Sequence, residues 1–402
     1  MPQVKIKHDA IASVEARLLK RLRARGAAPR VELARELSLA PSTIGIYVDR
    51  LLEDGFLLEG DKAVVDKGRP ATLLTLNPDG GRFVGVDIEA RNILAVSVDF
   101  SQRPIRKVHR RLRANEPHES VIAKIEEAIR EVVAGDHREV LAIGIGVPGT
   151  VDADRGLAVH YEYIRGWRDL PLKRHFERAF NAPVHLENNI RSMALAEMWF
   201  GLGRDVSSFI CLGVRSGIGA GVVVGGELCR GRHNVAGEIG GWPVHTGAFD
   251  VADDEGGDET SAAWRRLEDI ASTRVVAERL ASLEGAGVST KARMGLETSF
   301  ARWLAAARRG DVVVTAELAR VARALGLVVA QLSLALDPGK IVLAGPLTCF
   351  GDAILAPLVE TVERFSIPLH SAVPEVVCSE LGEYAGALGA AALAVHEWKP
   401  AR

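Results

Sequence analysis

Ten glycines lie within the 29 residues from 213 to 241, between short runs of β-branched residues. Glycine costs conformational entropy on folding, so this density indicates backbone that turns tightly or lies close to another group. That group is commonly a phosphate, which backbone N–H groups hold. The stretch contains no GxxxxGK[ST] motif, and its most conspicuous charges are Arg215 and Glu238. It therefore predicts part of a nucleotide or sugar site, whose catalytic groups have to be sought elsewhere in the chain.

The composition is that of an ordinary globular chain with room for about two or three domains. The net charge is −2, so a contact with nucleic acid would need a locally basic face. Four scattered cysteines without a CxxC pair indicate neither a disulfide framework nor a cysteine zinc site. The first residues do not resemble a signal peptide, and no apolar run has the length of a membrane helix. We therefore expect a cytoplasmic protein with no membrane partner.

Residues 1–80 carry the pattern of a winged helix-turn-helix. Apolar residues at helical spacing predict a helix from residue 14 to Gly26, a short helix at 31–37 and a third helix that ends at Gly55. Ser42 is the expected N-cap of the third helix, with Pro41 at its entrance. A hairpin is expected to follow, with strands at 56–59, 64–65 and 72–76 and a turn at Gly60 and Asp61.

In such a domain the second helix of the motif enters the major groove of DNA. Small polar residues on this helix permit close approach to base edges, longer ones reach further, and a basic wing can enter a narrow minor groove. The predicted contacts with a double-stranded DNA operator are Ser42, Thr43, Tyr47, Arg50, Lys67 and Arg69. Two alternatives remain open. Tyr47 and Arg50 could be solvated residues or phosphate contacts, and the weakly basic segment as a whole could be a protein-interaction module.

A break at NPDGG, residues 77–81, predicts a linker before the rest of the chain. Beyond it, two strands within 83–100, a third at 106–112, a helix at 120–133 and a buried strand at 140–147 predict a βββαβ lobe. A second lobe is expected to start near Ile190 with a helix. It continues with strands near 209–214 and 219–224, mostly helical sequence to 336, and a buried strand at 341–345.

Eight segments carry a resemblance to a known family: KGRPATLLTLN at 67–77, GVDI at 85–88, GIGVPGTVD at 144–152, GWRDLPL at 166–172, VHLENN at 184–189, GIGAGVVVGGELCRG at 217–231, AGEIG at 236–240 and YAGALGAAALA at 384–394. In content and order they resemble the ROK family (repressor, ORF, kinase) of sugar kinases and sugar-responsive repressors. The resemblance covers nearly the whole chain.

The resemblance implies an α/β chain with an N-terminal winged helix-turn-helix at 1–80 and a two-lobed actin/hexokinase-like (ribonuclease H-like) ROK domain at 81–402. Lobe 1 would comprise about 81–189 and a C-terminal helix at about 384–402, and lobe 2 about 190–383. The family places a sugar site between the lobes. Its members commonly form dimers or tetramers, so we expect a homodimer or a homotetramer.

The parts that a ROK sugar kinase uses for phosphoryl transfer are altered here. The first phosphate loop, Asp-x-Gly-Gly-Thr in the family, reads DIEAR at 87–91, where Glu89 would repel phosphate oxygens. Asn189 stands in place of the family's catalytic aspartate and cannot accept a proton at neutral pH. The second phosphate loop, at 214–219, keeps some glycines without an aligned threonine. We therefore predict no catalytic residue and no cofactor.

The family's zinc site is also missing. Gly241 stands where the family has a histidine, residues 259–268 contain no cysteine, and His245 is alone nearby. The acidic segment at 248–261 lacks the register of a calcium loop and is expected to be a surface loop. The sequence therefore predicts no bound metal.

Some sugar-binding character is retained. Asn188, Glu238 and Glu268 match family positions that bind sugar hydroxyls, and Asn189 could add a further hydrogen bond. We therefore expect a sugar or sugar-derivative effector, although a vestigial cleft remains an alternative. Trp167 is expected to pack inside the protein and not to stack on a ligand.

The leading hypothesis is a DNA-binding transcriptional regulator, most simply a repressor of sugar-related genes, with a non-catalytic kinase-like domain as effector sensor. Two alternatives stay open. One is a sugar kinase with an accessory DNA-binding domain, and the other is a DNA-binding or scaffold protein that needs no ligand.

Overall fold

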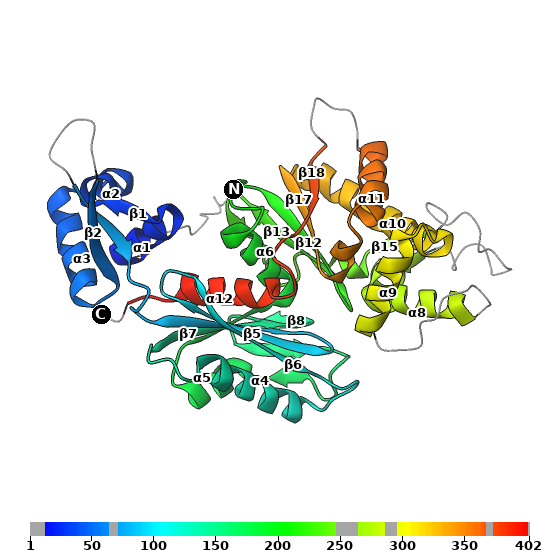
Figure 1. Ribbon diagram of the computed structural model, residues 1–402, viewed down its shortest axis with the longest axis horizontal. Helices are drawn as coiled ribbons and strands as arrows, with labels where there is room; N and C mark the ends of the chain where they lie inside the picture. Colours follow the sequence, from blue (N-terminus) through cyan, green and yellow to red (C-terminus); the bar gives the residue numbers. More distant parts are fainter. Residues whose placement is uncertain (1–12, 64–70, 247–263, 286–295, 367–372, 401–402) are drawn as a thin grey trace, which may run out of the picture.

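The computed structural model describes residues 13–63, 71–246, 264–285, 296–366 and 373–400. A small N-terminal domain lies at one side of the molecule, and two α/β lobes form the rest (Figure 1). Each lobe is built on a five-stranded sheet, and two helices lie between the sheets.

Within its described residues, the N-terminal domain has three helices and a three-stranded sheet. The helices are α1 (Val14–Arg25), α2 (Arg30–Leu37) and α3 (Pro41–Glu53), and the strands are β1 (Ala27–Pro29), β2 (Leu57–Ala63) and β3 (Ala71–Leu76). Antiparallel pairing of β3 with both other strands gives the order β1-β3-β2. The predicted sequence of helices followed by a hairpin is therefore confirmed, and β1 is an additional strand that the sequence did not indicate.

Two local predictions in this domain are wrong. Ala40, and not Ser42, is the N-cap of α3, because Pro41 already occupies the first helical position and fixes the entry. Gly60 and Asp61 do not form the hairpin turn. They lie inside β2, where the register against β3 shifts between Glu59 and Lys62 as in a β-bulge. The predicted strand at 64–65 lies outside the described residues.

The first lobe contains a sheet in the order β11-β7-β4-β5-β6. Its strands are β4 (Arg82–Ile88), β5 (Asn92–Asp99), β6 (Pro104–Arg111), β7 (Val140–Val147) and β11 (Val184–Asn188), with helices α4 (His118–Val133) and α5 (Leu172–Phe180) on the outer face. A small sheet of β8 (Thr150–Asp152), β9 (Leu157–His160) and β10 (Arg168–Leu170) follows β7. Trp167 is buried in this lobe's core, which confirms its packing role.

The second lobe contains a sheet in the order β14-β13-β12-β17-β18. Its strands are β12 (Phe209–Val214), β13 (Ile218–Val224), β14 (Glu227–Leu228), β17 (Lys340–Ala344) and β18 (Glu375–Cys378). Around it lie β15 (Pro243–His245), β16 (Trp264–Arg266), α7 (Glu268–Ala271), α8 (Thr273–Gly285), α9 (Leu296–Arg308), α10 (Val312–Leu336) and α11 (Asp352–Phe365). Within the described residues, α10 included, no helix is both long and apolar enough to cross a membrane.

Helices α6 (Asn189–Phe200) and α12 (Ala385–Glu397) pack on each other between the two sheets (Figure 1). Glycines make this packing close. A Cβ at Gly389 of α12 would overlap the carbonyl oxygen of Ser192 of α6, and a Cβ at Gly221 of β13 would overlap Ala194. Part of the glycine-rich block therefore brings α6 onto the second sheet, as its density predicts, although the close neighbour is a helix and not a phosphate.

The N-terminal domain shares one hydrophobic core with the first lobe. Phe56 stacks on Phe100 at a ring distance of 5.0 Å, and Trp398, just after α12, meets Phe56 edge to face at 5.0 Å. The Arg23 guanidinium lies 5.5 Å from the centre of the Phe100 ring, and burial lowers its pKa to about 10. The joint between the N-terminal domain and the lobe is therefore an aromatic core contact.

Candidate functional site

A cavity of about 360 Å³ lies between the two lobes, within the size range of small-molecule sites. The first lobe lines it with the segment after β7 and with the end of β9 and the residues that follow it, and the start of α6, which lies between the two sheets, lines it as well. The second lobe contributes the turn between β12 and β13, the segment before residue 239, and residues near α7. Among its lining residues are Asn188, Asn189, Glu238 and Glu268. The structure thus brings all four predicted ligand-binding residues into one cavity.

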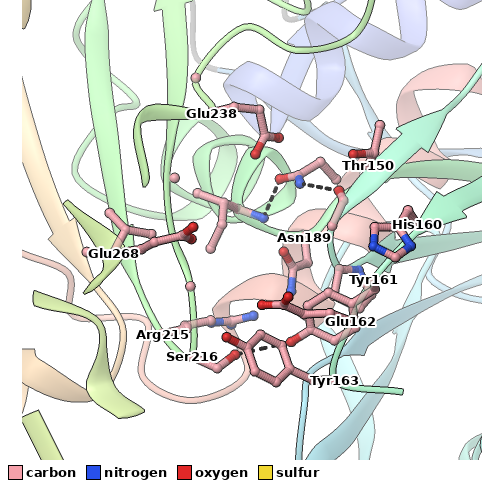
Figure 2. A pocket seen from close by; sticks show the side chains of 18 of the residues that line it. Thr150, His160, Tyr161, Glu162, Tyr163, Asn189, Arg215, Ser216, Glu238 and Glu268 are labelled. Carbon is pink, nitrogen blue, oxygen red and sulfur yellow. Dashed lines mark hydrogen bonds between the residues drawn. The ribbon is translucent and has the colours of Figure 1, made fainter. Parts of the chain in front are cut away.

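Two carboxylates face this cavity from the second lobe. Figure 2 shows Glu238 and Glu268 turned toward its interior, with His160, Tyr161 and Glu162 on another side. Burial raises the pKa of Glu238, and the nearby Glu268 adds to the rise while Arg191 opposes it. Burial also raises the pKa of Glu268. Partly desolvated carboxylates of this kind are strong acceptors for hydroxyl groups.

The two asparagines already have structural partners. The side-chain oxygen of Asn188 caps α6 by accepting from the backbone N–H groups of Ile190 (2.9 Å) and Arg191 (3.1 Å). Its amide nitrogen donates to the carbonyl of Gly149 at 3.1 Å. The amide nitrogen of Asn189 donates to the carbonyl of Ile88 at the end of β4, 3.0 Å away. Both residues therefore shape the cavity wall, and their contact with a ligand stays a prediction.

A buried ion-pair network supports the segment that carries Glu238. Glu187, at the end of β11, is fully buried and accepts from Arg191 Nε at 2.7 Å and from Arg230 Nε at 2.6 Å. Arg191 in turn donates to the carbonyl of Asn234 at 2.9 Å. Because Arg191 belongs to α6 and Asn234 precedes Glu238, this network fixes one cavity wall against the other.

Arg215 bridges the two lobes at the edge of the cavity. Its Nη1 lies 2.8 Å from Oδ2 of Asp87, near the end of β4, and 3.2 Å from Oε1 of Glu89, just after that strand, and its own backbone follows β12. The side chain is nearly buried and Asp87 is fully buried. Burial raises the pKa of Asp87 to about 7, against the opposing effect of Arg215. Burial alone would lower the pKa of Arg215, but the two carboxyls together outweigh burial and raise it, so the guanidinium stays charged.

Several cavity residues were missed by sequence reasoning. His160 ends β9, and Tyr161, Glu162 and Tyr163 follow it; Tyr161 Oη lies 3.2 Å from Ser216 Oγ of the other lobe. Arg266 also lines the cavity. The run HYEYI at 160–164 is a local cluster of polar aromatic residues, and it was the one signal that could have found this wall.

The predicted DNA-binding residues are distributed unevenly over α3. Ser42 is exposed and Thr43 is half-buried. Tyr47 is also half-buried and packs against the domain core. The Arg50 guanidinium faces acidic groups, with Glu15 at 3.8 Å and Asp54 at 4.0 Å. Lys67 and Arg69, the predicted wing contacts, lie outside the described residues. All six DNA contacts stay predictions.

Comparison with known proteins shows where this architecture occurs. The xylose repressor of Caldicellulosiruptor bescii is 26% identical over 374 residues, which cover 92% of this chain and 92% of the repressor. The glucokinase of Streptomyces coelicolor is 31% identical over 318 residues, or 78% of this chain and 98% of the enzyme. The repressor alignment therefore spans more of this chain than the glucokinase alignment does.

A solved structure of a ROK family transcriptional regulator, a homologue of the Escherichia coli MLC protein, superposes with a TM-score of 0.77 at 22% identity. The match covers 95% of this chain and 96% of that structure, which confirms the predicted fold of a winged helix-turn-helix followed by a two-lobed domain. Residues 83–397 match the model of the ROK family. The resemblance seen in the sequence is thus confirmed, and the chain belongs to the ROK family.

Proposed function

We propose that this protein is a DNA-binding transcriptional repressor of sugar-related genes, whose two-lobed domain senses a sugar or a sugar derivative. The observation that carries the proposal is the winged helix-turn-helix joined to the ROK domain through a common core. Similarity to a xylose repressor over 92% of both chains supports it. As a homodimer or homotetramer, the protein would place paired α3 helices on half-sites one or more helical turns apart.

In this proposal the cleft binds its effector but catalyses no reaction on it. The proposed ligand contacts are Glu238, Glu268, Asn188 and Asn189, whose acceptors and donors suit vicinal hydroxyls. Asn189 has no carboxylate to take a proton from a sugar hydroxyl. The Arg215 side chain occupies the space between the two segments that correspond to phosphate loops and pairs there with Asp87 and Glu89. Both features argue against phosphoryl transfer.

The effector would act by changing the angle between the lobes. A ligand shifts a conformational equilibrium only when it binds one state better than the other. A cavity lined from both lobes meets that requirement, since opening the lobes separates Glu238 from the wall formed by Tyr161 and Glu162. The first lobe shares a core with the DNA-binding domain, so this movement would change the spacing of paired domains in an oligomer.

The test starts with fragmented DNA from the source genome and the purified full chain. Fragments that the protein retains at moderate salt are sequenced, and the enriched site is measured by fluorescence anisotropy with a panel of neutral sugars and amino sugars. Enrichment of a site with two related halves, with an affinity that one sugar changes, supports the proposal. Retention of DNA without sequence preference contradicts it.

The second candidate function is sugar phosphorylation, which the similarity to a glucokinase favours. Its test is sugar-dependent consumption of ATP by the same preparation. Turnover that is lost in Glu238→Gln would establish this activity and overturn the non-catalytic part of our proposal. We expect no sugar-dependent turnover above that of the Glu238→Gln control.

A further inference from the structure

The exposed face of α3 divides into two halves of different character. The first half, from Pro41 to Ile46, contains no charged residue, whereas the second half carries Asp49, Arg50 and Glu53. Asp49 is paired with Arg30 of α2 at 2.6 Å. A phosphate backbone repels the acidic half, so the uncharged half is the part suited to lie deepest in a groove of DNA.

Ile46 projects from this uncharged half. Its relative exposure is 69%. Among the described residues of α3, it is the one large hydrophobic residue that is exposed. Its neighbours toward the core, Ile44 and Val48, are fully buried. Ile46 stands two residues from each of them, about 200° around the helix, which turns it away from the domain and onto the same exposed side as Ser42 and Asp49.

The longer polar residues predicted from the sequence are less available than Ile46. Tyr47 packs against the domain core, and the Arg50 guanidinium faces Glu15 and Asp54. Gly45, beside Ile46, has open space where a side chain would stand. Backbone near Ile46 can thus approach a surface closely, and Ile46 would make the first large contact.

The chemistry of an isoleucine limits what it can recognise in a major groove. Base edges there present hydrogen-bond donors and acceptors, which isoleucine cannot match, and one apolar group, the 5-methyl of thymine. Contact with that methyl removes apolar surface of both partners from water. A cytosine or guanine at the same step would instead leave a polar edge desolvated against the side chain.

We propose that Ile46 is a base-reading residue that recognises the 5-methyl group of a thymine in each operator half-site. The inference rests on the proposed DNA-binding function and specifies which side chain supplies part of its sequence preference. Ser42, one turn earlier on the same face, is free to contact a neighbouring base edge or phosphate. The site is thus read by a small polar residue and an apolar residue, four positions apart on one helix.

The experiment uses duplexes selected from a random library by the full-length protein. Each thymine in the selected half-site is replaced, one at a time, by deoxyuridine, which lacks only the methyl group. Affinities for the wild type and for Ile46→Ala are then compared by fluorescence anisotropy. Alanine has a high helix propensity and Ile46 is exposed, so the variant keeps the fold, which circular dichroism checks.

We expect one thymine per half-site at which loss of the methyl weakens wild-type binding about fourfold, the value of one buried methyl group. Ile46→Ala should bind the thymine duplex more weakly and lose its sensitivity to uracil at that position alone. Val31→Ala is the matched control, because Val31 is equally exposed at 69% but lies on α2. It should keep the full thymine preference.

The outcomes separate this inference from the function on which it rests. If no sequence is enriched, the proposed DNA-binding function fails. If a sequence is enriched and wild type and Ile46→Ala respond alike to every uracil substitution, the function stands and the role of Ile46 is overturned. A selected half-site that contains no thymine overturns it as well.

Discussion

The guanidinium of Arg215 lies 2.8 Å from the carboxylate of Asp87, and this ion pair joins the turn after β12 in one lobe to the end of β4 in the other. Asp87 is fully buried, and the first turn of α12 lies against it, since a Cβ at Gly386 would overlap its carboxylate. A charge buried this deeply costs free energy unless a partner of opposite charge compensates it, so the two side chains are expected to stay paired. Arg215 therefore links the two lobes by an ion pair at the edge of the cavity.

The first prediction concerns this pair. Arg215→Met should lower the free energy of unfolding by about 3–5 kcal/mol, because it removes the cation that pairs with the buried Asp87 and the half-buried Glu89. The added change Asp87→Asn should restore part of the loss by removing the uncompensated charge. Chemical denaturation measures both effects.

Arg266→Met is the matched control for that experiment. Arg266 lines the same cavity, but its side chain is 61% exposed, so its loss should cost less than about 1 kcal/mol. Equal stability of Arg215→Met and the wild type would show that this ion pair does not stabilise the contact between the lobes.

The second prediction is a pH dependence of effector binding. Burial raises the pKa values of Glu238 and Glu268, so each takes up a proton at a higher pH than a free glutamate does. A protonated carboxyl is a weaker acceptor, so affinity for the effector should fall as the pH is lowered from neutral, and the fall should begin at a higher pH than the titration of a free glutamate. Calorimetry with the sugar found by the panel measures the trend. Glu238→Gln should bind more weakly at pH 7 and vary less with pH, whereas a flat wild-type profile would exclude carboxylate acceptors.

The third prediction concerns Glu116, before α4. Burial alone would raise its pKa, but hydrogen bonds from Lys124, Ser120 and the backbone N–H of Arg113 outweigh burial and lower the pKa from 4.5 to about 2. A carboxyl with a depressed folded-state pKa stabilises the protein above its unfolded pKa, and this contribution disappears as pH falls through the folded value.

Glu116→Gln should therefore lower the free energy of unfolding by about 2 kcal/mol at neutral pH, with the difference shrinking below pH 4.5 and vanishing near pH 2. Glu119→Gln is the control, since the Glu119 side chain is 72% exposed. Urea unfolding across this pH range measures both variants. A difference that stays constant with pH would contradict the assigned charge interaction.

The fourth prediction concerns the joint between the DNA-binding domain and the first lobe. Trp398→Ala removes edge-to-face contacts with Phe56, Phe83 and Phe100 and should weaken the docking by about 2–3 kcal/mol. Hydrogen exchange should then accelerate in α1 to α3 before it does in β4. Trp264→Ala, at an exposed residue of the second lobe, should leave this protection unchanged. Unchanged exchange in Trp398→Ala would mean that the joint lies elsewhere.

The elements with strong periodicity could be predicted from the sequence. The amphipathic helix α4 and the buried strand β7 lie close to the expected residues, because each pattern spans a whole element and ends at a clear break. Short elements could not be predicted. Strand β1 is three residues long and exists only through pairing with β3, a contact distant in sequence. The bulge at Gly60 and Asp61 likewise depends on the partner strand.

The candidate cleft was only partly visible in the sequence. Asn188, Asn189, Glu238 and Glu268 could be named because they stand in motifs, and the fold brings them together. The pairing of Arg215 with Asp87 could not be deduced, because it joins residues 128 positions apart from two lobes. The glycine-rich block has in part a packing role, since Gly221 lies against Ala194, and no local pattern distinguishes that from a phosphate loop.

The central claim is that one chain couples sequence-specific DNA binding to ligand binding in a non-catalytic cleft. It is tested most directly by fluorescence anisotropy of the selected duplex, titrated with the full-length protein with and without the active sugar. The sugar should change the DNA affinity of the wild type by about 5- to 150-fold. Glu238→Gln should keep the sugar-free DNA affinity and lose the response. A DNA affinity that no sugar alters, or a response that Glu238→Gln retains in full, would contradict the claim.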